Sequence, residues 1–206
     1  MVVTRRQDLH HLSLRTQRLE LRTMTDADFP AWSEVRVRSR DWLTKWEPRL
    51  RGAPGMAEDR SSFAARCSAR ERERQLGVGY GFGIFDAEGF SGEITLSSIQ
   101  RGPFQNAVIG YWIDVAKAGR GYMPEACVAV LDFAFSSLSL HRVEIAIIPR
   151  NTASRRVVEK LEIRLEGIAE RMLEIDGVWE DHARYAITSE EWDVRGPELT
   201  GRYLTS

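Results

Sequence analysis

Apolar and polar residues follow different periods in different parts of this chain. Strict alternation over 18–22, and apolar runs bounded by turn-forming residues elsewhere, are typical of β-strands. An Asp176-Gly177 pair between two such runs favours a two-residue hairpin turn. The predicted strands cover 18–22, 79–85, 90–99, 107–115, 143–148, 168–175 and 178–188.

Helical patterns separate these strands. Thr25 and Asp28 have the spacing of a capping box and open the first predicted helix, which carries Phe29, Trp32 and Val35. Later apolar residues recur in pairs four positions apart, which predicts a helix with one face turned to a core. The other predicted helices cover about 57–75, the stretch that begins at Tyr122, and about 152–161.

The order of these elements indicates the fold class. A strand, two helices, three strands, a helix, a strand, a helix and two strands predict a mixed α/β domain whose sheet is mostly antiparallel in its middle. No linker, repeat or low-complexity tract divides it. Residues 1–13 are expected to form a flexible arm, residues 14–193 the domain, and residues 194–206 a C-terminal tail.

Composition narrows the class of protein. The chain has 206 residues, 43% of them hydrophobic, and a formal net charge of −1. No strong positive field would therefore draw it to nucleic acid or to an anionic membrane. Cys67 and Cys127 occupy apolar positions of helical patterns, and no cysteine or histidine spacing fits a zinc site. Because the N-terminus also lacks a signal-peptide pattern, we expect a cytoplasmic protein without a metal.

The stretch 113–126 carries the clearest chemical signal. An apolar strand leads into Gly119-Arg120-Gly121, and a helix follows at once from Tyr122. Such a junction points backbone N–H groups and the positive end of a helix dipole at one place, which suits a phosphate. The spacing of later residues fits neither a P-loop nor a dinucleotide fingerprint. A tight turn alone would also explain the two glycines.

A series of short motifs follows in a fixed order between Leu14 and Trp192. The motifs are Gly92-Glu93-Ile94-Thr95-Leu96, Ile109-Gly110-Tyr111-Trp112-Ile113-Asp114, Gly119-Arg120-Gly121-Tyr122, Leu140-His141-Arg142-Val143-Glu144, Pro149-Arg150-Asn151-Thr152-Ala153-Ser154 and Asp176-Gly177-Val178-Trp179-Glu180. Together they resemble the GNAT acetyltransferase superfamily, and more narrowly its RimJ/RimL branch, which acetylates protein N-termini. The resemblance implies a mostly antiparallel sheet, flanked by helices and splayed at its centre, where acetyl-CoA inserts between two strands.

The resemblance also assigns donor-binding residues. The strand 113–115 would pair with the pantetheine arm, and the amides of 117–122 would hold the pyrophosphate. Ala116 stands where the superfamily prefers Gln or Arg, which removes one side-chain contact. The residues expected to bind acetyl-CoA are Ile113, Asp114, Val115, Lys117, Gly119, Arg120, Gly121, Tyr122, Met123, Asn151, Ser154 and Arg156.

Two residues are expected to be catalytic. On the residues alone, Asn151 and Ser154 are explained as the N-cap and third residue of a helix. The resemblance adds that Ser154 protonates or hydrogen-bonds the leaving thiolate, a role that is compatible with capping. For the general base Glu93 ranks ahead of Asp114 and Glu170, and a structural carboxylate is the alternative for each.

The acceptor side is less well marked. The aromatic segment 42–48 lies where the family places the wall of its acceptor groove, so Trp46 and Glu47 are expected to bind the acceptor. Tyr111 is also expected to bind it. Glu162 stands where the family has a glycine in left-handed conformation, so the helix before it is expected to end differently.

The resemblance thus implies an N-acetyltransferase, and we expect it to work by direct attack of an amine on acetyl-CoA. A protein α-amino group has a pKa of about 8, so part of it is already neutral and needs little help from a base. The favoured acceptor is the N-terminal alanine of a ribosomal protein. The alternatives are an antibiotic, polyamine or amino acid as acceptor, a CoA-binding regulatory module without turnover, and a ribosome-associated binding protein.

Overall fold

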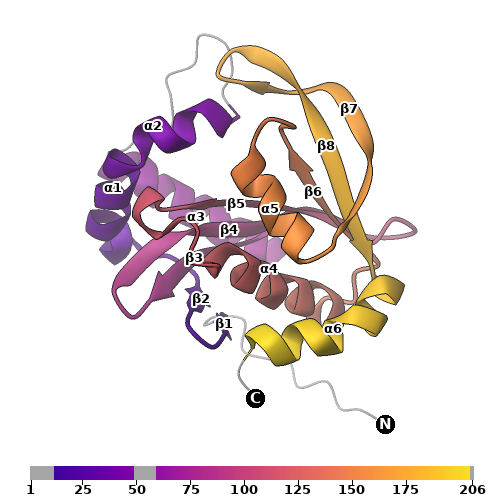
Figure 1. Cartoon of the computed structure of the whole chain (residues 1–206). Helices are drawn as coiled ribbons and strands as arrows, with labels where there is room; N and C mark the ends of the chain where they lie inside the picture. Colours follow the sequence, from indigo (N-terminus) through magenta and orange to yellow (C-terminus); the bar gives the residue numbers. More distant parts are fainter. Residues whose placement is uncertain (1–11, 49–58, 205–206) are drawn as a thin grey trace.

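The computed structural model describes residues 12–48 and 59–204, and an eight-stranded sheet forms its centre (Figure 1). The strands lie in the order β1-β2-β3-β4-β5-β6-β8-β7. All neighbours run antiparallel except β5 and β6, which are parallel. The strands are β1 (Ser13–Arg15), β2 (Glu20–Arg22), β3 (Tyr80–Asp86), β4 (Gly89–Gln100), β5 (Asn106–Ile113), β6 (Arg142–Ile147), β7 (Arg164–Ile175) and β8 (Val178–Thr188).

Helices cover the sheet. α1 packs on β4 and α3 packs on β3, while α4 lies between the sheet and α6 (Figure 1). Short 3₁₀ turns cover 26–28, 44–46 and 115–117, and a π-helical turn extends α4 over 133–137. The α-helices are α1 (Phe29–Arg38), α2 (Arg40–Leu43), α3 (Arg60–Leu76), α4 (Tyr122–Asp132), α5 (Thr152–Lys160) and α6 (Ser189–Tyr203).

The predicted fold class is confirmed. The seven predicted strands correspond to β2 to β8, and the four predicted helices to α1, α3, α4 and α5. The Thr25 N–H donates to the Asp28 carboxylate at 2.8 Å, as expected of the capping box. The predicted start of the second helix at residue 57 lies outside the described residues, which resume at Asp59.

The expected tail and arm need correction. Residues 194–203 are not a tail but continue α6, so the boundary expected at residue 193 falls inside a helix. Apolar residues are too sparse there to show a helical stripe, yet Trp192 stacks on Phe135 at 5.6 Å between ring centroids and Leu199 is buried. At the other end, Ser13 already belongs to β1, and residues 1–11 lie outside the described part.

The end of α5 also differs from the prediction. Glu162 takes the left-handed conformation, with φ of 48°, that the family gives to glycine. The Ile163 N–H donates to the Val158 carbonyl at 2.9 Å, as in the usual glycine-ended helix. The Arg195 guanidinium holds the Glu162 carbonyl at 2.7 Å and its carboxylate at 3.0 Å. These two contacts compensate for a residue that disfavours this conformation.

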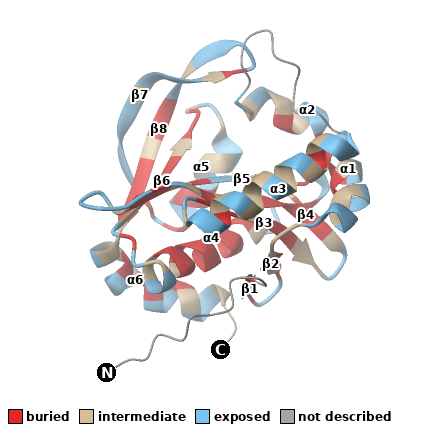
Figure 2. Ribbon diagram, turned by 180° about the vertical axis from the view of Figure 1, so that it is seen from behind, coloured by how far each residue is buried: buried red, intermediate tan, exposed pale blue. Residues whose placement is uncertain are grey.

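α4 is buried on all sides, beyond the single stripe predicted for it (Figure 2). Every residue from Met123 to Leu131 is buried, because the helix has the sheet on one side and α6 on another. Cys127 is fully buried, and burial raises the pKa of its thiol far above the usual range. The protein therefore keeps this sulfur as a neutral core group.

The sheet splits at its only parallel junction among the described strands. β5 and β6 pair only through Asn106 with Arg142, Ala107 with Val143 and Val108 with Glu144. Beyond these pairs β5 continues beside β4, and β6 continues beside β8. The two halves diverge, so backbone N–H and C=O groups on one edge of β5 have no strand partner.

Candidate active site

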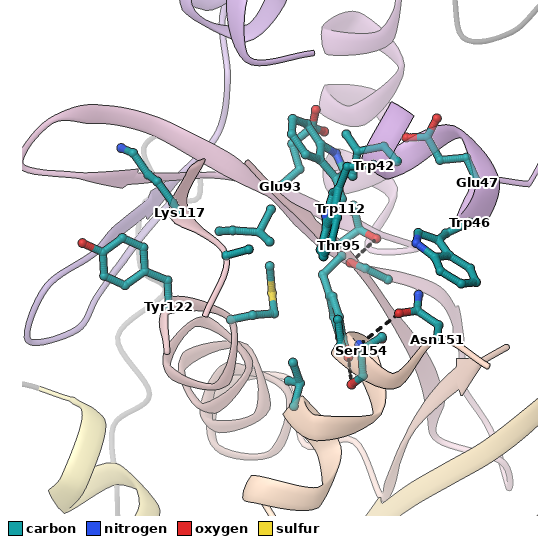
Figure 3. A pocket seen from close by; sticks show the side chains of 18 of the residues that line it. Trp42, Trp46, Glu47, Glu93, Thr95, Trp112, Lys117, Tyr122, Asn151 and Ser154 are labelled. Atoms are coloured by element: carbon teal, nitrogen blue, oxygen red, sulfur yellow. Dashed lines mark hydrogen bonds between the residues drawn. The ribbon is translucent and has the colours of Figure 1, made fainter. Parts of the chain in front are cut away.

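A cavity of about 1130 Å³ opens where the sheet splits. We name its two ends by their residues (Figure 3). The loop end consists of Ile113, Gly119, Gly121, Tyr122 and Met123, and the aromatic end of Arg36, Trp42, Trp46, Glu47 and Trp112. Ser154, at the start of α5, lies between Tyr122 and Trp46 in this view. Among the described residues, no group of three or more acidic, histidine or cysteine side chains could hold a metal ion.

The loop end has the form of an anion cradle. Gly119 and Gly121 have φ of 80° and 81°, and Gly121 is the N-cap of α4. The amides of Lys117, Ala118 and Arg120 donate to carbonyls within the turn. Among the described residues, no acceptor is found for the amides of Gly119, Gly121, Tyr122 and Met123. The amides available to an anion are therefore not the predicted 117–122 but these four at the start of α4, where the helix dipole also favours an anion.

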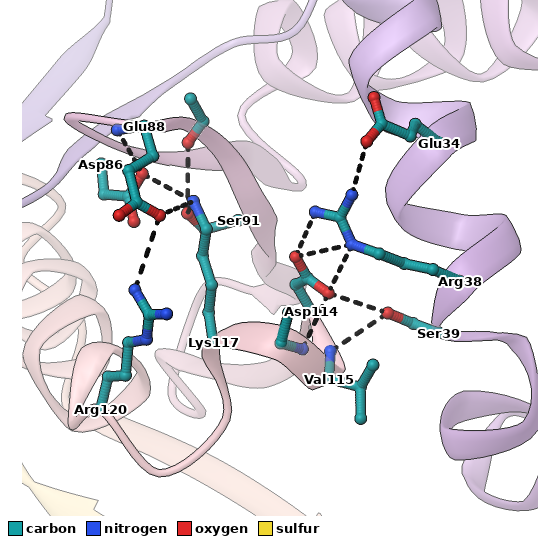
Figure 4. A network of polar contacts seen from close by, with 12 residues as sticks. Glu34, Arg38, Ser39, Asp86, Glu88, Ser91, Asp114, Val115, Lys117 and Arg120 are labelled. Atoms are coloured by element: carbon teal, nitrogen blue, oxygen red, sulfur yellow. Dashed lines mark hydrogen bonds and ion pairs between the residues drawn. The ribbon is translucent and has the colours of Figure 1, made fainter.

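Two networks fix this loop and engage the side chains of two residues predicted to bind the donor, Lys117 and Asp114 (Figure 4). The Lys117 ammonium donates to Asp86 at 2.7 Å and to Ser91 at 3.1 Å. The Asp114 carboxylate accepts from Arg38 at 2.5 Å and from Ser39 at 3.2 Å. Burial opposes ionisation of both carboxyls, but these hydrogen bonds hold the pKa of each below its usual value.

The strand expected to pair with the pantetheine arm is shorter than predicted. The Asp114 N–H donates to the Ser91 carbonyl at 2.8 Å, and the Val115 N–H donates to the Ser39 hydroxyl at 3.1 Å. Neither amide is left for a ligand. The open edge of β5 before Asp114 is what remains available for such pairing.

A third contact, which the sequence did not reveal, anchors the start of α4. Glu125 is almost fully buried, and its carboxylate accepts from the Thr16 hydroxyl at 2.6 Å and from the Arg18 side chain at 2.7 Å. Arg18 also donates to the Arg120 carbonyl at 3.1 Å. A glutamate within an otherwise apolar helix face was the only signal of this link between the N-terminal strands and the loop end.

Ser154 and Tyr111 meet in the middle of the cavity. The Asn151 side chain accepts from the Ser154 N–H at 3.1 Å, which confirms its predicted role as N-cap (Figure 3). The Ser154 hydroxyl donates to the Tyr111 hydroxyl at 3.0 Å, and Tyr111 donates to the Ser154 carbonyl at 3.2 Å. Burial raises the pKa of Tyr111 far above its usual value, so its hydroxyl stays protonated and able to donate.

Glu93 lines the cavity from β4. Its carboxylate accepts from the Trp32 indole N–H at 2.7 Å and lies 3.6 Å from the Arg66 guanidinium. The preceding Gly92 has φ of 156°, and a Cβ there would lie 2.3 Å from the Trp112 carbonyl oxygen. Glycine is therefore required for β4 and β5 to approach at this point, next to the cavity wall.

Segments distant in the sequence form the aromatic end. Glu47 forms two hydrogen bonds with the buried Arg36, whose guanidinium lies 5.2 Å from the centre of the Trp112 ring. Trp46 has the Arg150 guanidinium 5.5 Å from its ring centre. Arg150 in turn forms two hydrogen bonds with Glu180 of β8, at 2.6 and 2.7 Å. A bridge between Pro48 and Ile175 joins the same wall to the tip of the β7–β8 hairpin.

The cavity brings most of the predicted site residues together. Those that line it are Trp46, Glu47, Glu93, Tyr111, Ile113, Lys117, Gly119, Gly121, Tyr122, Met123, Asn151, Ser154 and Arg156. Asp114, Val115 and Arg120 do not line it, and Glu170 lies exposed on β7 outside it. The Arg120 side chain instead approaches Glu88 at 3.5 Å. Sequence reasoning missed Arg36, Arg66 and Trp112 as lining residues.

Comparison with known proteins identifies relatives over the whole fold. A family model described as an acetyltransferase (GNAT) domain matches residues 18–164. The chain is 29% identical over 189 residues to the [ribosomal protein uS5]-alanine N-acetyltransferase of Escherichia coli (strain K12), covering 91% of this chain and 96% of that protein. It is 48% identical over 108 residues to the probable N-acetyltransferase YjcK of Bacillus subtilis (strain 168), a stretch of 52% of this chain and 60% of YjcK.

Solved structures agree with this relationship. RimJ of Mycobacterium smegmatis in complex with CoA-disulfide has a TM-score of 0.85 at 32% identity, covering 95% of this chain and 96% of its own. The ribosomal-protein-S5-alanine acetyltransferase of Vibrio fischeri has a TM-score of 0.79 at 27% identity, covering 88% and 98%. No helix in the described residues is both long and apolar enough to cross a membrane. Because the family model matches well over half of the sequence, this chain belongs to the GNAT acetyltransferase family.

Proposed function

We propose that this enzyme transfers the acetyl group of acetyl-CoA to the N-terminal α-amino group of a protein, with an alanine-starting ribosomal protein as the favoured acceptor. The observation that carries this proposal is one continuous cavity, with an amide cradle at its loop end and aromatic side chains at its aromatic end. The relatives that resemble the chain over most of its length, named as acting on ribosomal protein S5, support the choice of acceptor. The reaction would take place in the cytoplasm, where ribosomal proteins are made.

The donor would lie from the loop end to Ser154. The amides of Gly119, Gly121, Tyr122 and Met123 would hold its pyrophosphate, and the open edge of β5 would pair with its pantetheine arm. Asn151 and Arg156 line the same side of the cavity and would contact the arm and a phosphate. A backbone N–H aimed at the thioester oxygen contributes about 3 kcal/mol to transition-state stabilisation in enzymes of this general type.

The chemistry would be a direct attack. The neutral amine attacks the thioester carbon, the C–S bond breaks, and Ser154 hydrogen-bonds or protonates the departing thiolate. Cys127 is fully buried with a raised pKa, and Cys67 does not line the cavity, so neither is suited to carry an acetyl group. Glu93, which faces the cavity beside Arg66, would accept the amine's proton through water.

A thiol-release assay tests the proposal. With acetyl-CoA, an alanine-starting peptide should release CoA, whereas kanamycin and spermine should not. Release with the small amines but not with the peptide would show a small-amine acetyltransferase. CoA binding without release across both kinds of acceptor would show a regulatory module. Mass analysis of cellular protein N-termini, with and without this enzyme, would then identify the acceptor.

A further inference from the structure

The pair formed by Tyr111 and Ser154 joins two elements on opposite sides of the split. Tyr111 comes from β5, and Ser154 is the third residue of α5. The Tyr111 hydroxyl oxygen lies 3.0 Å from the Ser154 hydroxyl and 3.2 Å from the Ser154 carbonyl. Both residues line the cavity between its two ends. A tyrosine here therefore has two acceptors within reach on one residue.

This geometry allows the hydrogen bonds to reverse without movement of heavier atoms. As the structure stands, Ser154 donates to Tyr111, so the serine proton is engaged with the tyrosine oxygen. If the Tyr111 O–H turns from the carbonyl to the Ser154 hydroxyl, the serine accepts this bond. Its own proton is then free to point elsewhere, because hydroxyl protons rotate to suit their partners. The protonated state of Tyr111, maintained by burial, is what this reversal needs.

We propose that Tyr111 is a positioning residue that directs the Ser154 hydroxyl proton toward the departing CoA sulfur by donating its own hydrogen bond to the serine oxygen. This inference rests on the proposed function, and it changes the role predicted for Tyr111 from acceptor binding to leaving-group assistance. In the step concerned, the bond from the acetyl carbon to sulfur breaks and its electron pair stays on sulfur. The serine O–H hydrogen-bonds to that sulfur and stabilises the thiolate while its proton stays on the serine oxygen, and Tyr111 keeps its own proton and polarises the serine hydroxyl by donating to it.

A purely structural role would have different consequences. A hydrogen bond that only ties β5 to α5 would influence stability and coenzyme affinity, and its loss would add to the loss of the Ser154 hydroxyl. A residue that only binds the acceptor would raise the KM for the acceptor. The positioning role predicts neither an additive loss with the Ser154 hydroxyl nor a raised KM for the acceptor, because Tyr111 then acts only through the serine hydroxyl and only as the sulfur becomes charged.

Kinetics of four proteins separate these roles: the wild type, Tyr111→Phe, Ser154→Ala and the double variant. We expect Tyr111→Phe to lower kcat about 20-fold and to leave the KM for acetyl-CoA and for the acceptor within about twofold. In the Ser154→Ala background the same change should alter kcat by less than about twofold. Tyr80→Phe, which removes a hydroxyl from a buried tyrosine outside the cavity, is the matched control and should keep full activity.

A second measurement does not depend on turnover. The thiol of bound CoA is titrated by its thiolate absorbance. Its pKa should be at least about 0.5 unit higher in Tyr111→Phe and in Ser154→Ala than in the wild type, because each variant loses the donor to sulfur. Multiplicative losses of kcat in the double variant, or a thiol pKa unchanged by Tyr111→Phe, overturn the inference alone. Absence of CoA binding at millimolar concentration overturns the proposed function, and the inference with it.

Discussion

The loop end and the aromatic end of the cavity differ in how their residues are spread along the chain. The loop end is one continuous stretch, from the end of β5 to the start of α4, fixed from outside by Asp86, Arg38 and Arg18. The aromatic end combines residues of α1, of α2 and the segment after it, and of the end of β5, and the β7–β8 hairpin is tied to it. Its walls meet through Arg36 with Glu47, Arg150 with Glu180, and the bridge from Pro48 to Ile175.

This difference indicates which end of the cavity relatives of the same fold can share and which end can vary from one relative to the next. A contiguous turn at a helix start binds an anion through backbone groups, so most side-chain changes leave it intact. The aromatic end depends on side chains brought together from distant segments, and each can change separately. We therefore expect donor binding to tolerate substitution better than acceptor choice does.

The largest expected effect concerns the support of the loop end. Asp86→Ala leaves the buried Lys117 ammonium without its main partner, which should lower the free energy of unfolding by about 3 kcal/mol. Chemical denaturation measures this change. Glu198→Ala, which breaks an exposed pair with Arg202, is the control and should cost less than about 0.5 kcal/mol. Equal effects of the two substitutions would mean that the loop end does not depend on this anchor.

The next effect concerns the junction between the two ends. Ser154→Ala removes the hydroxyl but keeps the N–H that Asn151 caps, so the helix start should survive. We expect kcat to fall about 100-fold while CoA affinity, measured by calorimetry, stays within about twofold. Ser136→Ala, an exposed serine in the turn after α4, provides the comparison. An unchanged kcat would mean that Ser154 serves only in the cap of α5 and not in catalysis.

A smaller effect tests whether the aromatic end selects the acceptor. Trp46→Ala should raise the KM for the acceptor about tenfold, since loss of a packed aromatic surface costs on the order of 1.4 kcal/mol in binding. The KM for acetyl-CoA should not change. Trp179→Ala removes an exposed tryptophan of the β7–β8 hairpin that does not line the cavity, and should leave both constants unaltered. A change in the KM for acetyl-CoA would contradict the division into two ends.

The smallest effect is a pH dependence at the base of the β7–β8 hairpin. Hydrogen bonds from Arg142 lower the pKa of Glu166 from 4.5 to about 2. Because the folded pKa lies below the unfolded one, this stabilisation is complete above the unfolded pKa and is lost as pH falls toward the folded pKa. The difference in unfolding free energy between wild type and Glu166→Gln should be below about 1 kcal/mol at about pH 6 and should vanish near the folded pKa. A difference that grows on acidification would disprove this origin.

Sequence reasoning worked where the determinants were local. The capping box at Thr25, the hairpin turn at Asp176-Gly177 and the junction 113–126 each depend on neighbours within a few residues. α6 was missed because its buried residues, Trp192 and Leu199, are too widely spaced to form a visible stripe. Glu162 was misjudged because Arg195, which holds it in place, lies 33 residues away in the sequence.

Prediction of the site was limited in the same way by contacts between residues that are far apart in the sequence. Residue type and position indicated that Asp114 and Lys117 lie near the cradle, but not the direction of their side chains, which is set by Arg38 and Asp86. Arg36 and Trp112 joined the cavity wall through contacts that no local pattern contains. Asn151 and Ser154 were placed correctly because a helix start fixes both by backbone geometry.

Only three residue pairs join β5 to β6, and the rest of that edge of β5 ends in the cavity. Backbone polar groups need partners, and a ligand with amide groups of its own would supply them along this edge. On the proposed function, the pantetheine arm of the coenzyme would pair with this edge in the place of a further strand. The melting temperature of the protein should then rise with coenzyme concentration, because a ligand that binds only the folded state stabilises it.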